Sequence, residues 1–160
     1  MPEISEPLRD KRQTVKRIFW LADRFKNDLH TIYTARHGQR VPVSELSLRE
    51  FYDFVKALPY KRDIEPVEIV ARPSLVIERV LNGEGKDCKK AAVLLGSYCN
   101  LNGIKWRLAC ISNRRDLQIH HIFNQVDMYL NGQYQNCDAT YSYMSIFEPK
   151  YVTKAEYFSC

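Results

Sequence analysis

The chain has 160 residues, of which 45% are hydrophobic and 27% are charged. This length and composition are typical of one globular domain that buries its own core, and they exclude a disordered chain. No apolar run approaches the roughly 20 residues that cross a bilayer, and the polar first residues lack the apolar segment of a secretory signal. We therefore expect no membrane span and a cytoplasmic location.

The net charge of +5 raises the question of nucleic-acid binding. Much of the positive charge lies in the segment RDKRQTVKR at residues 9–17, and such a segment can contact nucleic acid or an acidic surface. No RNP-like, helix-turn-helix or Gly-rich phosphate motif accompanies it. We therefore interpret the segment as the solvated face of an amphipathic helix, and we do not expect nucleic acid as a partner.

The chain has five cysteines, which are Cys88, Cys99, Cys110, Cys137 and Cys160. An odd number at irregular spacing, without a secretory signal, indicates reduced thiols in a cytosol-like compartment. There is no CxxC pair, and no set of Cys and His has the spacing of a zinc finger. We expect neither a metal ion nor a cofactor.

The first half of the chain is predicted to be mainly helical. Apolar residues recur every three or four positions over residues 8–35, a pattern that predicts one long amphipathic helix. Ser47 and Glu50 then form a capping-box pattern at the start of a second, shorter helix. The segment 60–87 contains several prolines and glycines, and we predict turns there with one short helix at 74–81.

The second half is predicted to begin with a helix and to continue as an antiparallel sheet. Residues 88–101 carry a strong helical pattern, and residues 104–110 then alternate between apolar and polar, as a half-buried strand does. A second alternating stretch at 121–130 is followed by Asn131-Gly132, a strong hairpin signal, and by a return strand. Helices followed by antiparallel strands indicate an α+β fold.

Three residues in this order suit nucleophilic catalysis. Cys88 begins the central helix, His121 begins a strand, and Asp138 lies on the return strand. The partial positive charge at a helix N-terminus favours a thiolate, and a neighbouring imidazole can hold that thiolate in an ion pair. A carboxylate orients such an imidazole, and amides at the helix start can receive an oxyanion. We therefore take these three residues as a candidate catalytic triad.

The predicted hairpin register tests the triad only weakly. If a two-residue turn pairs Leu130 with Gln133, then Asp138 lies opposite Gln125 and on the same face of the sheet as His121. Asp138 and His121 are then about two positions too far apart for direct contact. Only a bulge or a shifted turn would bring them together.

Each member of the triad also has an ordinary structural explanation. Cys88 could be an inert buried thiol, although Cys99 and Cys110 lie on apolar faces and suit that role better. His121 could be a surface residue of a strand, and the neighbouring His120 could act in its place. Asp138 could simply favour the end of a strand.

The motifs GKDCKKAAVLLGSYCNLNGI, HHIF and YLNGQYQNCDAT, with the spacing between them, resemble the transglutaminase-like superfamily of papain-type cysteine enzymes. Members carry Gly-Asp-Cys at the head of a helix, a His at the start of a strand and an Asp after a hairpin. The segment PYKRDIEPVEIVARPSLVIERVLNGEGKDC is similar to the short, often phage-encoded, members. The resemblance covers residues 51–140, and the residues before 47 match no motif of this family.

The resemblance implies a papain-like α+β core, in which the helix that carries the cysteine packs on an antiparallel sheet. It also implies that Cys88 is the nucleophile, His121 the base and Asp138 the orienting carboxylate. Residues 1–46 would form an N-terminal helical extension and residues 47–160 the catalytic domain, together one compact unit.

The chain departs from the family pattern around the cysteine. Lys86 stands where the family has Gly before the Asp, and Lys89 and Lys90 follow the Cys where acidic residues are common. Two lysines in the first helical turn oppose the helix dipole, but they favour a thiolate. The departures remove no catalytic group.

The resemblance implies a cysteine peptidase, amidase or transglutaminase-like acyltransferase that acts on a protein or peptide substrate through a thioester, with hydrolysis favoured over cross-linking. It would also bring Tyr60, Lys61 and Asp63 to the cleft. The similarity to phage proteins implies a role in virion assembly, maturation or penetration of the host, a virion-associated location and contacts with other virion proteins. The alternative is a virion protein that keeps this fold as a structural or interaction module without turnover.

Overall fold

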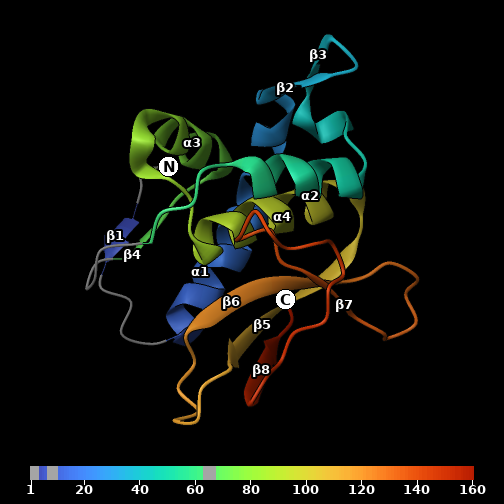
Figure 1. The fold of residues 1–160 in the computed structure, drawn as a ribbon. Coiled ribbons are helices and arrows are strands. Elements are labelled where there is room, and N and C mark those ends of the chain that lie inside the picture. Colours follow the sequence, from blue (N-terminus) through green and yellow to red (C-terminus); the bar gives the residue numbers. More distant parts are fainter. Residues whose placement is uncertain (1–3, 7–10, 63–67) are drawn as a thin grey trace.

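The computed structural model describes residues 4–6, 11–62 and 68–160 of the chain. Its helices lie together on one side of a four-stranded sheet (Figure 1). The α-helices of the described part are α1 (Lys11–Arg24), α2 (Leu48–Ala57), α3 (Pro73–Arg79) and α4 (Cys88–Asn102). Shorter helical segments are η1 (Lys26–His30), η2 (Val43–Glu45) and η3 (Val80–Glu84).

The four-stranded sheet has the strand order β7-β6-β5-β8, and each neighbouring pair is antiparallel. Its strands are β5 (Lys105–Ser112), β6 (His121–Asp127), β7 (Gln135–Cys137) and β8 (Lys154–Phe158). Two small antiparallel sheets pair β1 (Ile4–Glu6) with β4 (Glu68–Val70), and β2 (Tyr33–Arg36) with β3 (Gln39–Pro42). The α+β prediction, with helices packed on antiparallel strands, is confirmed.

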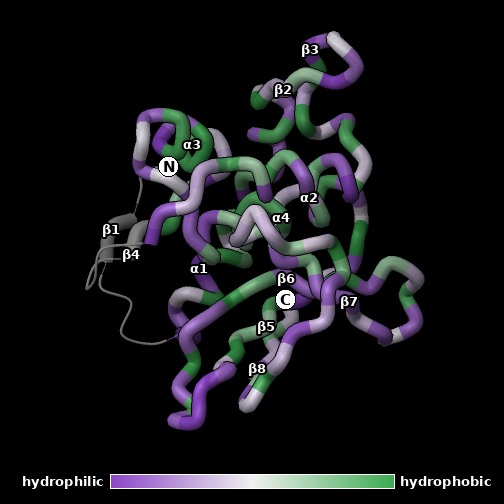
Figure 2. Tube along the Cα trace, viewed as in Figure 1, coloured by the Kyte–Doolittle hydropathy of each residue, from purple (hydrophilic) through white to green (hydrophobic). Residues whose placement is uncertain are grey.

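Helix α4 is the centre of the core, because α1, α2, β5 and β6 all pack on it. Its run AAVLLGSYC is buried throughout, and hydrophobic residues gather along this helix and the strands beside it (Figure 2). Gly96 permits the closest approach, since a Cβ there would lie 2.5 Å from the Trp106 ring and 3.1 Å from Ala22 Cβ. Side chains of α1 and α4 share one hydrophobic cluster. The division of the chain into an extension over residues 1–46 and a catalytic domain over residues 47–160 stays a prediction.

The prediction of one helix over residues 8–35 is wrong, although its start lies outside the described residues. Helix α1 ends at Arg24, and the chain continues through η1 into the β2–β3 hairpin. The buried Asp28 in η1 accepts hydrogen bonds from the guanidinium of Arg72 and from the amide and hydroxyl of Ser74. These contacts fix η1 against α3 and account for the end of the helix.

The other helices begin and end close to their predicted positions. In α2 the capping box is present, because Ser47 Oγ accepts from the Glu50 amide and Glu50 Oε1 accepts from the Ser47 amide. Helix α4 ends one residue later than predicted, and Gly103 follows it in the left-handed conformation that a helix C-terminus favours. Helix α3 with η3 occupies the region of the predicted short helix.

The predicted two-residue turn after β6 is wrong. Strand β6 ends at Asp127, whose buried carboxylate accepts hydrogen bonds from the amides of Asn131 (3.1 Å) and Gly132 (2.9 Å). These bonds gather residues 128–134 into a longer loop in place of a tight turn, and Leu130 takes a positive φ within it.

The longer loop shifts the register of the hairpin by two residues. Asn124 pairs with Cys137, so the same register, continued by one residue, places Asp138 opposite Phe123. A shift of two keeps each side chain on its predicted face of the sheet. It also moves Asp138 to the position diagonal to His121, within reach of direct contact.

Strand β8 was not among the sequence predictions. It pairs with β5 along the edge opposite β7, and Glu156 in β8 forms an ion pair with Lys11 of α1 at 2.8 Å. The C-terminal residues thus help to hold α1 in place. Within the described ranges, no helix has both the length and the apolar character required to cross a membrane.

Candidate active site

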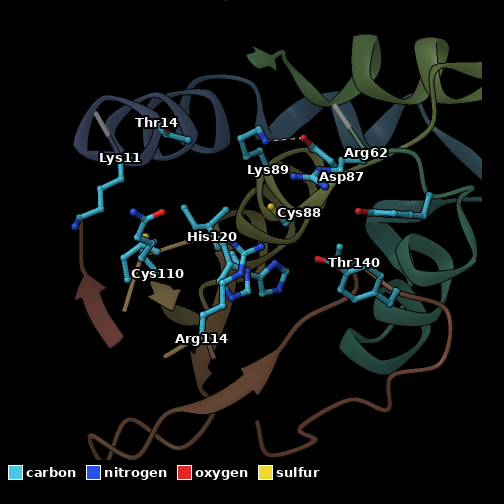
Figure 3. Close-up of a pocket in the computed structure, with 16 residues that line it drawn as sticks. Lys11, Thr14, Arg62, Asp87, Cys88, Lys89, Cys110, Arg114, His120 and Thr140 are labelled. Atoms are coloured by element: carbon cyan, nitrogen blue, oxygen red, sulfur yellow. Dashed lines mark ion pairs between the residues drawn. The ribbon is translucent and has the colours of Figure 1, made fainter. Parts of the chain in front are cut away.

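A cavity of about 530 Å³ opens at the N-terminus of α4. Its walls come from α1, the segment after α2, the start of α4, the β5–β6 region and the segment after β7. Cys88 lies among these walls with its sulfur facing the open space (Figure 3). The cavity therefore brings together segments that are far apart in the sequence around one partly exposed thiol.

Cys88 is held at the first turn of α4 by an ordinary helix cap. The carboxylate of Asp87, the N-cap residue, accepts a hydrogen bond from the Lys90 amide at 2.9 Å. This bond satisfies one of the amides that a helix leaves unpaired at its start. The thiol thus stands where the positive end of the helix dipole favours an anion.

The chain just before the cap is fixed by a close contact with the segment after α2. The Lys86 amide donates to Pro59 O at 2.7 Å, and the Lys61 amide donates to Lys86 O at 2.9 Å. Gly85 has φ +69°, and a Cβ there would lie 2.5 Å from Lys61 Cβ. Only glycine fits this approach without strain, and it sets the path of the chain into Cys88.

Lys86, which replaces the glycine of the family pattern, is a structural residue. Its side chain is fully buried, and its ammonium donates to the carbonyls of Leu58 (2.6 Å) and Lys56 (3.2 Å) at the end of α2. Burial lowers its pKa to about 8, although the Asp138 carboxylate acts in the opposite direction. The cation thus caps the negative end of α2 and ties that helix to the loop before Cys88.

The two lysines after Cys88 also fold back onto that loop. Lys89 Nζ lies 2.8 Å from the Asp87 carboxylate, and Lys90 Nζ donates to Gly85 O at 3.3 Å. Both side chains are buried. These contacts explain how two cations are tolerated in the first turn of a helix, where the dipole disfavours them.

His121 contacts both other members of the predicted triad. Its Nε2 lies 2.6 Å from Asp138 Oδ2, and Cys88 lies close enough to the ring to help raise the pKa of His121. Because Asp138 takes Nε2, Nδ1 is the nitrogen left for the thiol. The structure therefore brings Cys88, His121 and Asp138 together in that order, through the shifted hairpin register.

The Asp138 carboxylate is hydrogen bonded at both oxygens. Thr140 donates to Oδ1 from its amide (3.0 Å) and its hydroxyl (2.6 Å), while Lys150 Nζ lies 2.8 Å from Oδ2, the oxygen that His121 also contacts. The backbone is fixed as well, since the Tyr52 hydroxyl of α2 donates to Asp138 O at 2.8 Å. Such a carboxylate is held in one orientation toward the imidazole.

The charges within the site favour an ion pair between His121 and Asp138. Burial alone would lower the pKa of His121, but the hydrogen bonds and charges of Asp138 and Cys88 outweigh it and raise the pKa to about 9. Burial would raise the pKa of Asp138, but His121 and Lys150 hold it well below its usual value. Near neutral pH the pair is therefore an imidazolium and a carboxylate.

The competing residues make other contacts, although His120 and Cys110 also line the cavity. His120 is exposed, and its Nε2 is bonded to the side chain of Asn113 at 2.8 Å. Cys99 and Cys110 are buried in the core, where burial raises the pKa of each thiol to about 12. Cys137 is buried too, and Cys160 is exposed at the chain end.

Aromatic side chains form one wall beside the imidazole. Tyr141 stacks on His121 with ring centroids 6.0 Å apart, and the Tyr60 ring lies 5.0 Å from that of Tyr141. Tyr60, which the family resemblance points to, thus lines the cavity. Lys61 acts through its backbone and is not among the lining residues, and Asp63 lies outside the described residues.

Sequence reasoning missed Thr140 and Lys150. The pattern Asp-Ala-Thr is a signal that could have pointed to Thr140, because a hydroxyl and amide two residues after an Asp often bond to its carboxylate. Lys150 has no such signal, since a long loop separates it from Asp138.

In the described residues, no group of three or more His, Cys, Asp or Glu side chains is arranged to hold a metal ion.

Comparison of the chain with models of protein families, with curated proteins and with solved structures finds no match. The assignment of function therefore depends on the geometry of the site and on the motif resemblance.

Proposed function

We propose that this protein is a transglutaminase-like cysteine enzyme with a papain-type core, and that it transfers the acyl group of an amide through a thioester. The observation that carries the proposal is the arrangement at the edge of a cavity, where Cys88 and His121 line the same space and His121 Nε2 lies 2.6 Å from Asp138 Oδ2. A thiol that only filled the core would need neither an oriented imidazole nor a buried carboxylate behind it.

The roles of the three residues follow from their order. The Cys88 thiolate attacks the amide carbonyl carbon, and the amides at the start of α4 are available to the oxyanion that forms. The His121 imidazolium then gives its proton to the leaving amine as the C–N bond breaks. A thioester remains on Cys88.

The second half of the reaction releases the thioester. His121, now neutral, takes a proton from water, and the hydroxide attacks the thioester carbonyl, so that a carboxylic acid leaves and the thiolate is restored. An amine in place of water would give a new amide bond. We favour hydrolysis, because a small domain offers little surface for a second protein substrate.

Alkylation of the thiols tests this proposal. We expect iodoacetamide to modify Cys88 at neutral pH at least about tenfold faster than Cys160, because a helix N-terminus and an adjacent imidazole both make a thiol more nucleophilic. Mass spectrometry of the digested protein measures both rates in one sample. In the His121→Gln variant the rate at Cys88 should fall, and the rate at Cys160, which serves as the internal control, should not change.

The alternative of a silent structural or interaction protein predicts a different result. If Cys88 reacts no faster than Cys160 in the folded wild-type protein, the proposal of an enzyme fails. A Cys88→Ser variant should also lose any amidase or transamidase activity of the wild type. The proposed setting, a phage virion or its assembly, rests on the motif resemblance alone.

A further inference from the structure

The cavity around Cys88 is strongly cationic. Of the described residues that line it, Lys11, Arg62, Lys89 and Arg114 carry a permanent positive charge, and Asp87 alone carries a carboxylate. A cavity whose walls bear an excess of one charge concentrates ligands of the opposite charge.

The two lysines of this set already have anionic partners. Lys89 Nζ lies 2.8 Å from the Asp87 carboxylate, and Lys11 Nζ lies 2.8 Å from Glu156. Their charges are therefore largely balanced within the protein. These two lysines are therefore not the groups that we expect to bind an anionic ligand.

Arg62 and Arg114 differ from the lysines in this respect. Both are exposed, and neither has an ion-pair partner among the described residues. Arg62 follows the segment that is fixed against Lys86, and Arg114 belongs to the polar loop between β5 and β6. In Figure 3 the two side chains lie on either side of Cys88. Two guanidinium groups without a carboxylate partner in the described part of the chain thus flank the thiol that the proposed function makes the nucleophile.

We infer that the acyl substrate is an acidic peptide, with carboxylate side chains on both sides of the reacting carbonyl that pair with Arg62 and Arg114. This inference rests on the proposed function. A guanidinium is suited to this task because its N–H groups match a carboxylate in a bidentate pair. A peptide is preferred to a nucleic acid because acyl transfer needs an amide carbonyl, which a phosphodiester backbone lacks.

The charge of an alkylating reagent tests the inference on the whole protein. Iodoacetate and iodoacetamide both lose iodide to the same thiolate, and they differ in one negative charge. The ratio of their rate constants therefore cancels the thiolate fraction and reports the local charge. We expect this ratio at Cys88 to exceed that at Cys160 by about threefold or more at low salt, and the difference to shrink at 0.5 M salt.

Variants assign the effect to the two arginines. Arg62→Gln and Arg114→Gln should each lower the ratio at Cys88, and the double variant should bring it close to that at Cys160. Arg115→Gln is the matched control, because Arg115 is an exposed neighbour that does not line the cavity. An unchanged ratio in the double variant would overturn the inference.

Protection by peptides identifies the class of substrate. A short Glu-rich peptide should slow the iodoacetamide labelling of Cys88 at low salt, and a Lys-rich peptide of equal length should not. Stronger protection by a short oligonucleotide than by the Glu-rich peptide would also overturn the inference, in favour of nucleic acid.

The outcomes separate this inference from the proposed function. Fast labelling of Cys88 by iodoacetamide with no preference for iodoacetate would support the proposed enzyme and contradict the proposed acidic substrate. Slow labelling of Cys88 with a preference for iodoacetate would contradict the proposed enzyme and support a cavity that binds anions.

Discussion

The geometry of the site depends on the carboxylate of Asp138. One of its oxygens contacts both His121 and Lys150, and the other accepts two hydrogen bonds from Thr140. A buried carboxylate requires partners of this kind, because an unpaired charge in a core is costly. The same partners stop it from rotating away from the imidazole.

Replacement of Asp138 by Asn should make the stability of the protein depend differently on pH. The folded-state pKa of His121 is raised to about 9, above an unfolded value near 6.5. Its interaction with Asp138 therefore stabilises the fold fully below about pH 6.5 and is lost as the pH rises through 9. Asp138, whose pKa is lowered, keeps its contribution above about pH 4 and loses it as the pH falls further.

The wild type should thus exceed Asp138→Asn in free energy of unfolding by about 2–4 kcal/mol between pH 4 and 6.5, with a smaller difference at pH 9. Urea denaturation at a series of pH values measures this difference. A difference that does not vary with pH would mean that the two residues form no ion pair.

Among the structural elements, the loop after β6 decides whether the triad can form. The sequence predicts β6, the return strand and their faces correctly, because alternation of apolar and polar residues carries that information. The length of the loop depends on the Asp127 carboxylate and on the two amides that it binds. A rule based on the pair Asn131-Gly132 alone cannot include that contact, and so it places Asp138 two residues too far from His121.

Asp127→Ala should therefore cost more than the loss of an ordinary loop contact. We expect a loss of stability, because two amides lose their shared acceptor, and faster hydrogen exchange at Asn131 and Gly132. Asp116→Ala is a matched control, since Asp116 accepts one hydrogen bond, from the Gln118 amide, in an exposed loop. Equal costs for the two variants would contradict the role given to Asp127.

On the scale of the whole molecule, the packing of α1, α4 and β5 joins the N-terminal part of the chain to the site. Sequence periodicity identifies α1 and α4 as helices, but their contact depends on Gly96, which leaves room for Trp106 and Ala22. Pairing between β5 and the distant strand β8 likewise has no local signal. For the same reason the sequence could not place Lys11 and Thr14 of α1 in the wall of the cavity.

Gly96→Ala tests this packing. Alanine is the better helix former by about 1 kcal/mol, yet its methyl group would lie 2.5 Å from the Trp106 ring. We expect the overpacking to dominate and to destabilise the protein by about 1–3 kcal/mol in thermal or urea denaturation. In a protein that already carries Trp106→Leu, Gly96→Ala should cost less stability, because the smaller leucine side chain leaves room for the methyl group. Equal costs in both backgrounds would contradict the contact.

The span of the contacts that complete the site has a consequence for the newly made chain. The Tyr52 hydroxyl bonds to a carbonyl 86 residues later, and Lys11 pairs with Glu156, 145 residues later. Contacts between such distant residues form late, because the loops they close cost entropy that local structure does not. During folding, the Cys88 thiol would therefore be present before its imidazole and carboxylate are oriented. Reactivity would begin only when these distant contacts have formed and β8 has joined the sheet.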